Sequence, residues 1–144
     1  MAITRLNPNT IFLGGERTQV GDLACSEAIT PGMLVEEFNN GGIIRWRKAT
    51  ADIAGPPAIA TEHAMANRGV DDNYIASDLL EVSIGHKGAT FWGLIASGQN
   101  IAAGALLGSA GGGTLKSGAT VARFTALENK PSVTVLTRIR VEVL

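Results

Sequence analysis

The residues that could carry out chemistry are few and lie far apart in the sequence. The 144-residue chain has two histidines, His63 and His86, and one cysteine, Cys25. A metal site needs a spacing that brings two ligands to one face of an element, and no such spacing is present. His86 lies in the turn 85–88, where a solvated polar residue is ordinary. His63 follows Glu62, which favours a structural hydrogen bond over general-base catalysis. We predict no metal site and no cofactor.

Other catalytic patterns fail on geometry. Asp71 and Asp72 are adjacent, so their carboxylates would point apart in an extended chain. The glycine-rich run 108–113 lacks the Gly-Lys-Ser/Thr and the helix of a phosphate-binding loop, and a hairpin turn explains it better. The serines lack a G-x-S-x-G elbow, and Cys25 is expected to be a small buried side chain. We therefore expect no catalytic residue and no enzyme activity.

The composition disfavours nucleic acid and membrane partners. The net charge is −1, and Arg45, Arg47 and Lys48 are best interpreted as the solvated face of a strand. No apolar run approaches the roughly 18–20 residues that cross a membrane, and no signal-peptide pattern opens the sequence. We therefore expect synthesis and use in the cytoplasm unless a particle carries the chain out. Only 17% of residues are charged, and such a surface suits coverage by protein partners.

The elements that must position any functional surface are short strands. From Ile29 onward, short apolar segments alternate with turns rich in Gly, Pro and Asn. No segment of about 10–15 residues has the period of a crossover helix. This pattern predicts an all-β domain, a small antiparallel β-barrel or jelly-roll-like sandwich. The strands are expected at 33–38, 43–49, 58–61, 79–84, 89–96, 105–109, 114–116 and 121–128, with one helical turn at 62–68 closed by Gly69.

The clearest strand pattern lies near residue 140. Residues 133, 135, 139, 141 and 143 are Val or Ile, and the residues at 132, 134, 138, 140 and 142 between them are polar. This alternation predicts a half-buried strand.

A short internal repeat accompanies the strands. The pattern Ile29-x-x-Gly32-x-Leu34 recurs as Ile101-x-x-Gly104-x-Leu106, and a Gly-rich turn follows each copy. The glycine of each turn is expected to have a positive φ, which a Cβ atom would resist. We predict two equivalent hairpins on opposite sides of a barrel, although the high content of Gly and Ala makes chance an alternative.

The first 24 residues hold no strand or helical period for long. We predict an extended arm over residues 1–24 that docks on a neighbouring subunit, followed by a single barrel domain over residues 25–144. A frayed terminus with one edge strand is the alternative. Three apolar residues in the arm would need a cover, so partner-binding residues are predicted at Ile11, Phe12, Leu13 and Arg17.

Three segments of the sequence resemble head decoration (cement) proteins of tailed bacteriophages. They are residues 28–36, 69–80 and 138–143, and the resemblance runs from Ile29 onward. One departure is Ser77, where the family pattern would have a Gly before Asp78. The resemblance implies a small β-barrel or jelly-roll-like protein on the exterior of an expanded capsid. It also implies a dimer or trimer that clamps adjacent subunits of the major capsid protein, with no cofactor.

A non-catalytic ligand- or glycan-binding module on a virion or cell surface is the main alternative. Sugar-binding surfaces usually present exposed Trp or Tyr rings. This chain offers only Trp46, Trp92 and Tyr74, and Trp92 lies inside an apolar run that predicts a core position.

Overall fold

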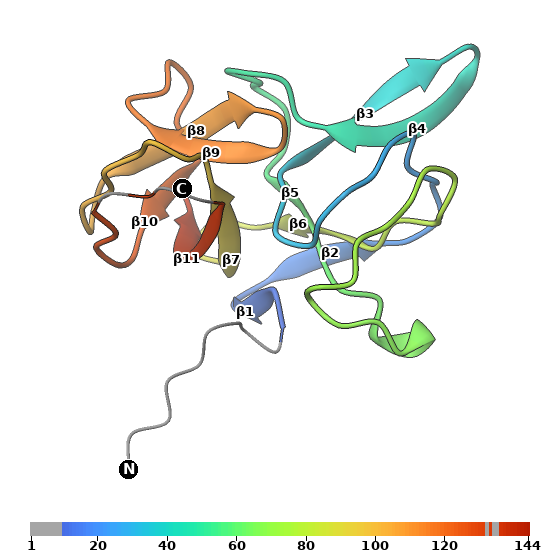
Figure 1. Ribbon diagram of the computed structural model, residues 1–144, viewed down its shortest axis with the longest axis horizontal. Coiled ribbons are helices and arrows are strands. Elements are labelled where there is room, and N and C mark those ends of the chain that lie inside the picture. The colour runs from blue at the N-terminus through green and yellow to red at the C-terminus, as the bar shows by residue number, and fades with distance from the viewer. Residues whose placement is uncertain (1–9, 132, 134–135) are drawn as a thin grey trace.

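The computed structural model describes residues 10–131, 133 and 136–144, and its regular structure is almost entirely strand (Figure 1). One short 3₁₀ turn, η1 (Ala64–Ala66), is the exception, and the described residues contain no α-helix. The all-β prediction is confirmed. The strands are β1 (Phe12–Gly14), β2 (Arg17–Val20), β3 (Val35–Asn40), β4 (Ile43–Lys48), β5 (Ala58–Ala60), β6 (Val82–Gly85), β7 (Thr90–Ile95), β8 (Leu106–Gly111), β9 (Thr114–Ser117), β10 (Phe124–Ala126) and β11 (Thr137–Val143).

The strands form two units of the same topology. In the second unit, the sheet order is β7-β11-β10-β8-β9, with β1 added outside β7. In the first unit, β2-β6-β5 form one sheet and β3-β4 another, and the bridge between Leu34 and Ile59 joins β3 to β5. If the five strands of each unit are numbered along the chain, both units therefore have the same order across the sheet: first, fifth, fourth, second, third. The two units lie side by side in Figure 1.

Backbone hydrogen bonds repeat from one unit to the other. In the first unit, Gly32 N–H donates to the Ala60 carbonyl, and Ala60 N–H donates to the Met33 carbonyl. In the second unit, Gly104 N–H donates to the Ala126 carbonyl, and Ala126 N–H donates to the Ala105 carbonyl. The internal repeat seen in the sequence is thus a repeat of the fold.

The isolated bridge that precedes each hairpin is also repeated. Ile29 exchanges two backbone hydrogen bonds with Tyr74, and Ile101 exchanges two with Lys130. The glycine of each following turn has the predicted positive φ, +100° at Gly32 and +86° at Gly104.

Neither unit closes into a true barrel, so this part of the prediction is wrong. In the second unit, β9 returns to β7 through one parallel residue pair, Ile95 and Leu115. In the first unit, Cys25 and Trp46 form the corresponding parallel bridge. In each unit a single residue pair stands where a closed barrel would have a continuous ladder.

The hydrophobic core is divided in the same way. One cluster is centred on the second unit but also receives residues of the first, including Leu34, Ala49 and Ile59. A second cluster of buried residues is centred on the first unit, around Ile29, Trp46 and Tyr74, and also includes Leu94 of β7. Because the first cluster contains side chains from both units, its packing holds the two units against each other.

Most local predictions are confirmed. The turns at 39–42 and 110–113 each join a hairpin, β3-β4 and β8-β9. Strand β11 buries Ile139, Val141 and Val143 on one face, while the predicted positions 132, 134 and 135 lie outside the described residues. The predicted helical turn is shorter than expected. It is η1, and Asn67 closes it in the left-handed conformation in place of Gly69.

The predicted N-terminal arm is wrong for residues 10–24. This segment forms β1 on the edge of β7 and β2 on the edge of β6, and Ala24 then bridges Leu79. Apolar residues at the start of the segment pair within their own chain because β7 and β6 offer open edges there. The part of the predicted arm over residues 1–9 lies outside the described residues.

Candidate interaction surfaces

The ionisable residues do not assemble into a reactive cluster. In the described part of the chain, no group of three His, Cys, Asp or Glu side chains could hold a metal ion. His63 Nε2 lies 3.7 Å from a carboxylate oxygen of Glu81, and His86 Nε2 lies 2.9 Å from the hydroxyl of Thr18. Among the described contacts, His86 therefore has a hydroxyl beside it but no carboxylate to orient its ring, and His63 has a carboxylate but no hydroxyl or thiol.

Cys25 is a buried structural residue, as predicted. Its thiol donates a hydrogen bond to the Ile75 carbonyl at 3.1 Å. Burial raises the pKa of the Cys25 thiol, and the nearby Asp78 charge adds to the effect. The group therefore stays protonated and unreactive at neutral pH.

The predicted apolar triplet is distributed between core and surface. Ile11 is fully buried, and its backbone N–H donates to Glu62 Oε2 at 3.0 Å, so its prediction as an exposed anchor is wrong. Phe12 is half-buried against the ring of Phe91, 5.4 Å between centroids. The guanidinium of Arg17 lies over the Phe12 ring at 4.0 Å and donates to the Ser83 hydroxyl. Leu13 alone of the triplet is exposed.

The connection between β5 and β6, residues 61–81, is the largest irregular segment and is hereafter the docking loop. Its counterpart in the second unit, residues 127–136, is much shorter. Apart from the short turn η1 it has no regular structure, and connections longer than about 12–15 residues are uncommon in compact domains and often functional. The docking loop exposes three large apolar side chains, Met65 at 99%, Ile75 at 64% and Leu79 at 54%.

The docking loop is held by its own polar side chains. The hydroxyl of the buried Tyr74 donates to the Thr61 carbonyl at 2.7 Å. Asp78 Oδ2 accepts from the backbone N–H of Ile75 and from Arg68, each at about 3 Å. The Ile75 N–H and then the Arg68 guanidinium lower the pKa of Asp78, so the carboxylate remains charged.

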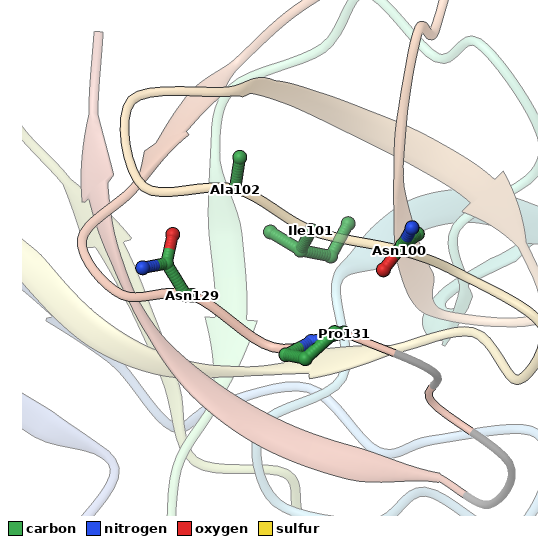
Figure 2. A pocket seen from close by; sticks show the side chains of 5 residues that line it. All are labelled: Asn100, Ile101, Ala102, Asn129 and Pro131. Carbon is green, nitrogen blue, oxygen red and sulfur yellow. The ribbon is translucent and has the colours of Figure 1, made fainter.

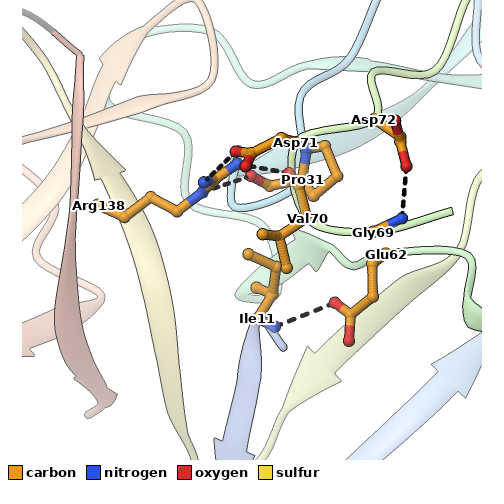
Figure 3. Close-up of polar contacts among 8 residues, drawn as sticks. All are labelled: Ile11, Pro31, Glu62, Gly69, Val70, Asp71, Asp72 and Arg138. Atoms are coloured by element: carbon orange, nitrogen blue, oxygen red, sulfur yellow. Dashed lines mark hydrogen bonds and ion pairs between the residues drawn. The ribbon is translucent and has the colours of Figure 1, made fainter. Parts of the chain in front are cut away.

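Arg138 fastens the docking loop to both units. Its side chain is only 9% exposed and donates to three acceptors on two other segments (Figure 3). Nε donates to the Pro31 carbonyl at 3.1 Å, Nη2 to the Val70 carbonyl at 2.6 Å, and Nη1 to Asp71 Oδ1 at 3.1 Å. Nearby, the Gly69 N–H donates to Asp72 Oδ2 at 2.6 Å, which closes the turn. Asp71 and Asp72 thus order this turn individually and do not form an acid–base pair.

The hairpin β3-β4 carries a second apolar surface. It projects away from the rest of the first unit (Figure 1), and Ile43 and Ile44 next to its turn are exposed. The basic residues at its base are largely paired, because Arg47 contacts Glu36 at 2.7 Å and Lys48 contacts Glu27 at 3.9 Å. The exposed Ile43 and Ile44 therefore give the hairpin an apolar contact surface next to its turn.

A shallow groove in the second unit has a volume of about 380 Å³ (Figure 2). None of its lining side chains is ionisable: Asn100, Ile101, Ala102, Asn129 and Pro131. The amide oxygen of Asn129 already accepts from the Ala103 N–H at 2.8 Å. The groove therefore lacks a group for acid–base or nucleophilic chemistry.

The aromatic residues that a sugar would stack on are covered. Tyr74 and Trp46 are buried, and Trp92 is half-buried against the core. No helix among the described residues is long and apolar enough to cross a membrane.

The structure exposes apolar side chains in a segment that the sequence analysis did not single out. Met65, Ile75 and Leu79 were not predicted, although the length between the strands at 58–61 and 79–84 and the apolar residues within it were a usable signal.

Comparison with known proteins identifies the fold. No protein-family model matches this sequence, and no curated protein matches it. Among solved structures, the fold is similar to the N base of head fibre gp8.5 of bacteriophage phi29, with a TM-score of 0.55 and 13% sequence identity. The similarity covers 86% of this chain and 93% of that chain. The protein therefore shares its all-β fold with the base of a phage head fibre.

Proposed function

We propose that the protein is a non-catalytic structural component of a tailed-phage head, bound to the outside of the expanded capsid. The observation that carries this proposal is the fold shared with a head-fibre base over most of both chains. The resemblance of residues 28–36, 69–80 and 138–143 to head decoration proteins supports the same setting. The partner is the major capsid protein, and each copy bridges adjacent capsid subunits as a cement, together with other copies of itself.

The docking loop is the proposed contact with the capsid. Met65, Ile75 and Leu79 are exposed on a backbone that Tyr74, Asp78 and Arg138 hold in place. A preordered loop loses little conformational entropy on binding, so more of the burial energy appears as affinity. Fully burying one such side chain contributes about 1.5–3 kcal/mol. Many copies on one shell then act together, so each contact can be weak. Leu13 is retained as a second, smaller contact.

Binding to purified expanded heads that lack the protein tests this proposal. The double variant Met65→Glu/Ile75→Glu should reduce occupancy at least tenfold in co-sedimentation, because it places two charges in the contact. Leu127→Glu, an exposed apolar residue of the second unit, is the matched control and should bind normally. Equal occupancy of the loop variant and the wild type would refute the docking loop, and no binding of the wild type would refute the capsid role.

A further inference from the structure

The turn of hairpin β3-β4 contains a pair of residues that can react with each other. Asn40 is the only asparagine in the sequence that a glycine follows. In such a pair, the backbone nitrogen of the glycine can attack the side-chain carbonyl carbon of the asparagine and close a five-membered ring. Glycine favours this attack because it has no Cβ atom to crowd the ring and its backbone rotates most freely. The pair therefore has the residue types of a spontaneous modification site.

The structure leaves both reacting groups open to solvent. Asn40 and Gly41 are exposed, and the pairing of β3 with β4 ends at Asn40 and Ile43, so the Gly41 nitrogen lies outside the ladder. Gly41 has a φ of +65°, and a Cβ atom there would meet no atom within 4 Å. Water therefore reaches the side-chain amide, the attacking nitrogen and the space in which the ring forms.

The neighbouring asparagine is held differently. The Oδ1 atom of Asn39 accepts a hydrogen bond from the Gly42 N–H at 2.7 Å, and the residue that follows Asn39 has a side chain. In the described part of the chain, no hydrogen bond holds the Asn40 amide. The two adjacent residues are both exposed, but only Asn40 combines a free amide with a following glycine. Asn39 is therefore an internal control for Asn40.

The hairpin can supply the movement that the reaction needs. An asparagine at the end of a strand must rotate about its Cα–C bond before its side chain meets the next nitrogen. The β3-β4 sheet has only two strands, and it projects away from the rest of the first unit (Figure 1). A two-stranded hairpin has little stability of its own, so its turn opens at a low free-energy cost without unfolding of the core.

We propose that Asn40 is a site of spontaneous deamidation. The Gly41 nitrogen bonds to the Asn40 Cγ atom, the Cγ–Nδ2 bond breaks, and the side-chain nitrogen leaves as ammonia with the proton from the Gly41 N–H. Water then adds to either carbonyl of the cyclic imide and breaks one of its two ring C–N bonds. The products are aspartate and isoaspartate at position 40. Water is the only co-reactant, and no atom is oxidised or reduced.

Both products change the surface that the hairpin presents. Each adds one negative charge to a chain whose net charge is −1, and the charge lies beside Ile43, which is 58% exposed. Isoaspartate also places its Cβ atom in the main chain, which lengthens β3 by one atom and disrupts its pairing with Ile43. The amide does not re-form in water, so the neutral tip becomes a charged one as the protein ages. This conversion does not depend on the capsid role.

Mass spectrometry of the purified full-length protein, incubated at mildly alkaline pH, provides the test. Trypsin leaves both asparagines in the peptide that ends at Arg45, and fragmentation of that peptide separates them. Asn40 should gain the mass that a carboxyl group adds over an amide, in two peptides of different retention time, whereas Asn39 should not. Gly41→Ala should slow the gain about tenfold or more, because its Cβ atom hinders the attack.

Asn40→Gln is the matched control, because its longer side chain keeps the amide but would have to close a six-membered ring. It should show no gain at position 40 and should keep the wild-type melting temperature, since the Asn40 side chain is exposed. A synthetic peptide of residues 36–45 measures the rate of the same sequence without the fold.

Three results would overturn the proposal. Wild-type protein in which Asn40 stays intact after the peptide has converted would show that the folded hairpin prevents the reaction. A gain at Asn39 equal to that at Asn40 would show that the glycine has no part in it. An unchanged rate in Gly41→Ala, or an equal gain at position 40 in Asn40→Gln, would exclude attack by the Gly41 nitrogen.

Discussion

Replacing Arg138 with Met should destabilise the protein by about 2–4 kcal/mol, because one buried guanidinium serves three acceptors. Met retains most of the buried aliphatic volume but provides no donor. The carbonyls of Pro31 and Val70 then lose their charged partner. A hydrogen bond to a charged group contributes about 1.5–3 kcal/mol, and a buried acceptor left unpaired costs about 1–3 kcal/mol.

The ion pair with Asp71 should account for little of this loss. The Asp71 side chain is 61% exposed, so water screens its charge, and exposed pairs contribute at most about 1 kcal/mol. Asp71→Asn should therefore cost well under half of what Arg138→Met costs. The carbonyl contacts, which tie Pro31 and Val70 to β11, dominate the expected loss.

Urea unfolding of Arg138→Met and of a matched control measures the effect. Arg140→Met changes the same residue type on the same strand, but Arg140 is 49% exposed and lies 3.5 Å from Glu128. We expect the control to cost no more than about 0.5 kcal/mol. The melting temperature should fall by about 6–12 °C for Arg138→Met.

Two results would refute this reasoning. A loss below about 1 kcal/mol for Arg138→Met would mean that water or a neighbour replaces the guanidinium at both carbonyls. An equal loss for Arg140→Met would mean that any arginine on β11 matters, irrespective of burial. Faster hydrogen exchange confined to residues 69–72 is the expected local signature of Arg138→Met.

Three further predictions concern backbone strain and pH. Gly32→Val should lower the free energy of unfolding by about 1–3 kcal/mol. The φ of Gly32 is +100°, and a Cβ atom there would lie 3.0 Å from the Trp92 carbonyl oxygen. A urea midpoint equal to that of the wild type would contradict this prediction. Ser77→Gly should raise stability by about 0.5 kcal/mol, because Ser77 has a φ of +78° and glycine adopts that region without strain; a lower melting temperature would count against it. The pKa of Asp78 is lower in the folded protein than its ordinary value. The Asp78 carboxylate therefore stabilises the folded state fully above its unfolded-state pKa of about 4. This stabilisation is lost as the pH falls through the folded-state pKa. Asp78→Asn should therefore weaken the dependence of stability on pH below about pH 4, and an identical acid profile in urea titrations would refute this.

Local patterns in the sequence predict the hairpins and β11 because their causes are local. The residues at 39–42 are Asn-Asn-Gly-Gly, and a tight turn needs residues that tolerate positive φ. The alternation of Ile139, Val141 and Val143 with charged residues needs only a period of two to indicate a half-buried strand. At Ser77 the resemblance to decoration proteins implies a glycine, and the structure gives the serine a positive φ.

The N-terminal segment shows where local reasoning stops. The run Ile11-Phe12-Leu13 indicates that some surface must cover it, but it does not indicate whose surface. The cover is β7, about 80 residues further along the same chain. The same limit applies to Arg138, whose partners Pro31 and Val70 come from two distant segments. Arg138, Pro31 and Val70 each lie in one of the three segments that resemble decoration proteins. The Arg138 guanidinium therefore holds these three segments together.

The tandem arrangement could be predicted only in part. The repeat of Ile, Gly and Leu around 29–34 and 101–106 is visible, but the connections after the hairpins differ in length, so no single offset aligns the two halves. The corresponding strands are recognised from their pairing, which depends on contacts between distant residues.

The position of β11 has a consequence for how the protein forms in a cell. This strand follows the others along the chain, yet it lies between β7 and β10, and it pairs along six residues of β7. The second unit therefore cannot assemble its sheet until the ribosome has released β11. Until then, β7 and β10 present open edges and apolar faces to other nascent chains, a state that favours aggregation. Slower expression or lower temperature should therefore raise the soluble yield, and β11 rather than the N-terminal strands should be the segment least tolerant of truncation.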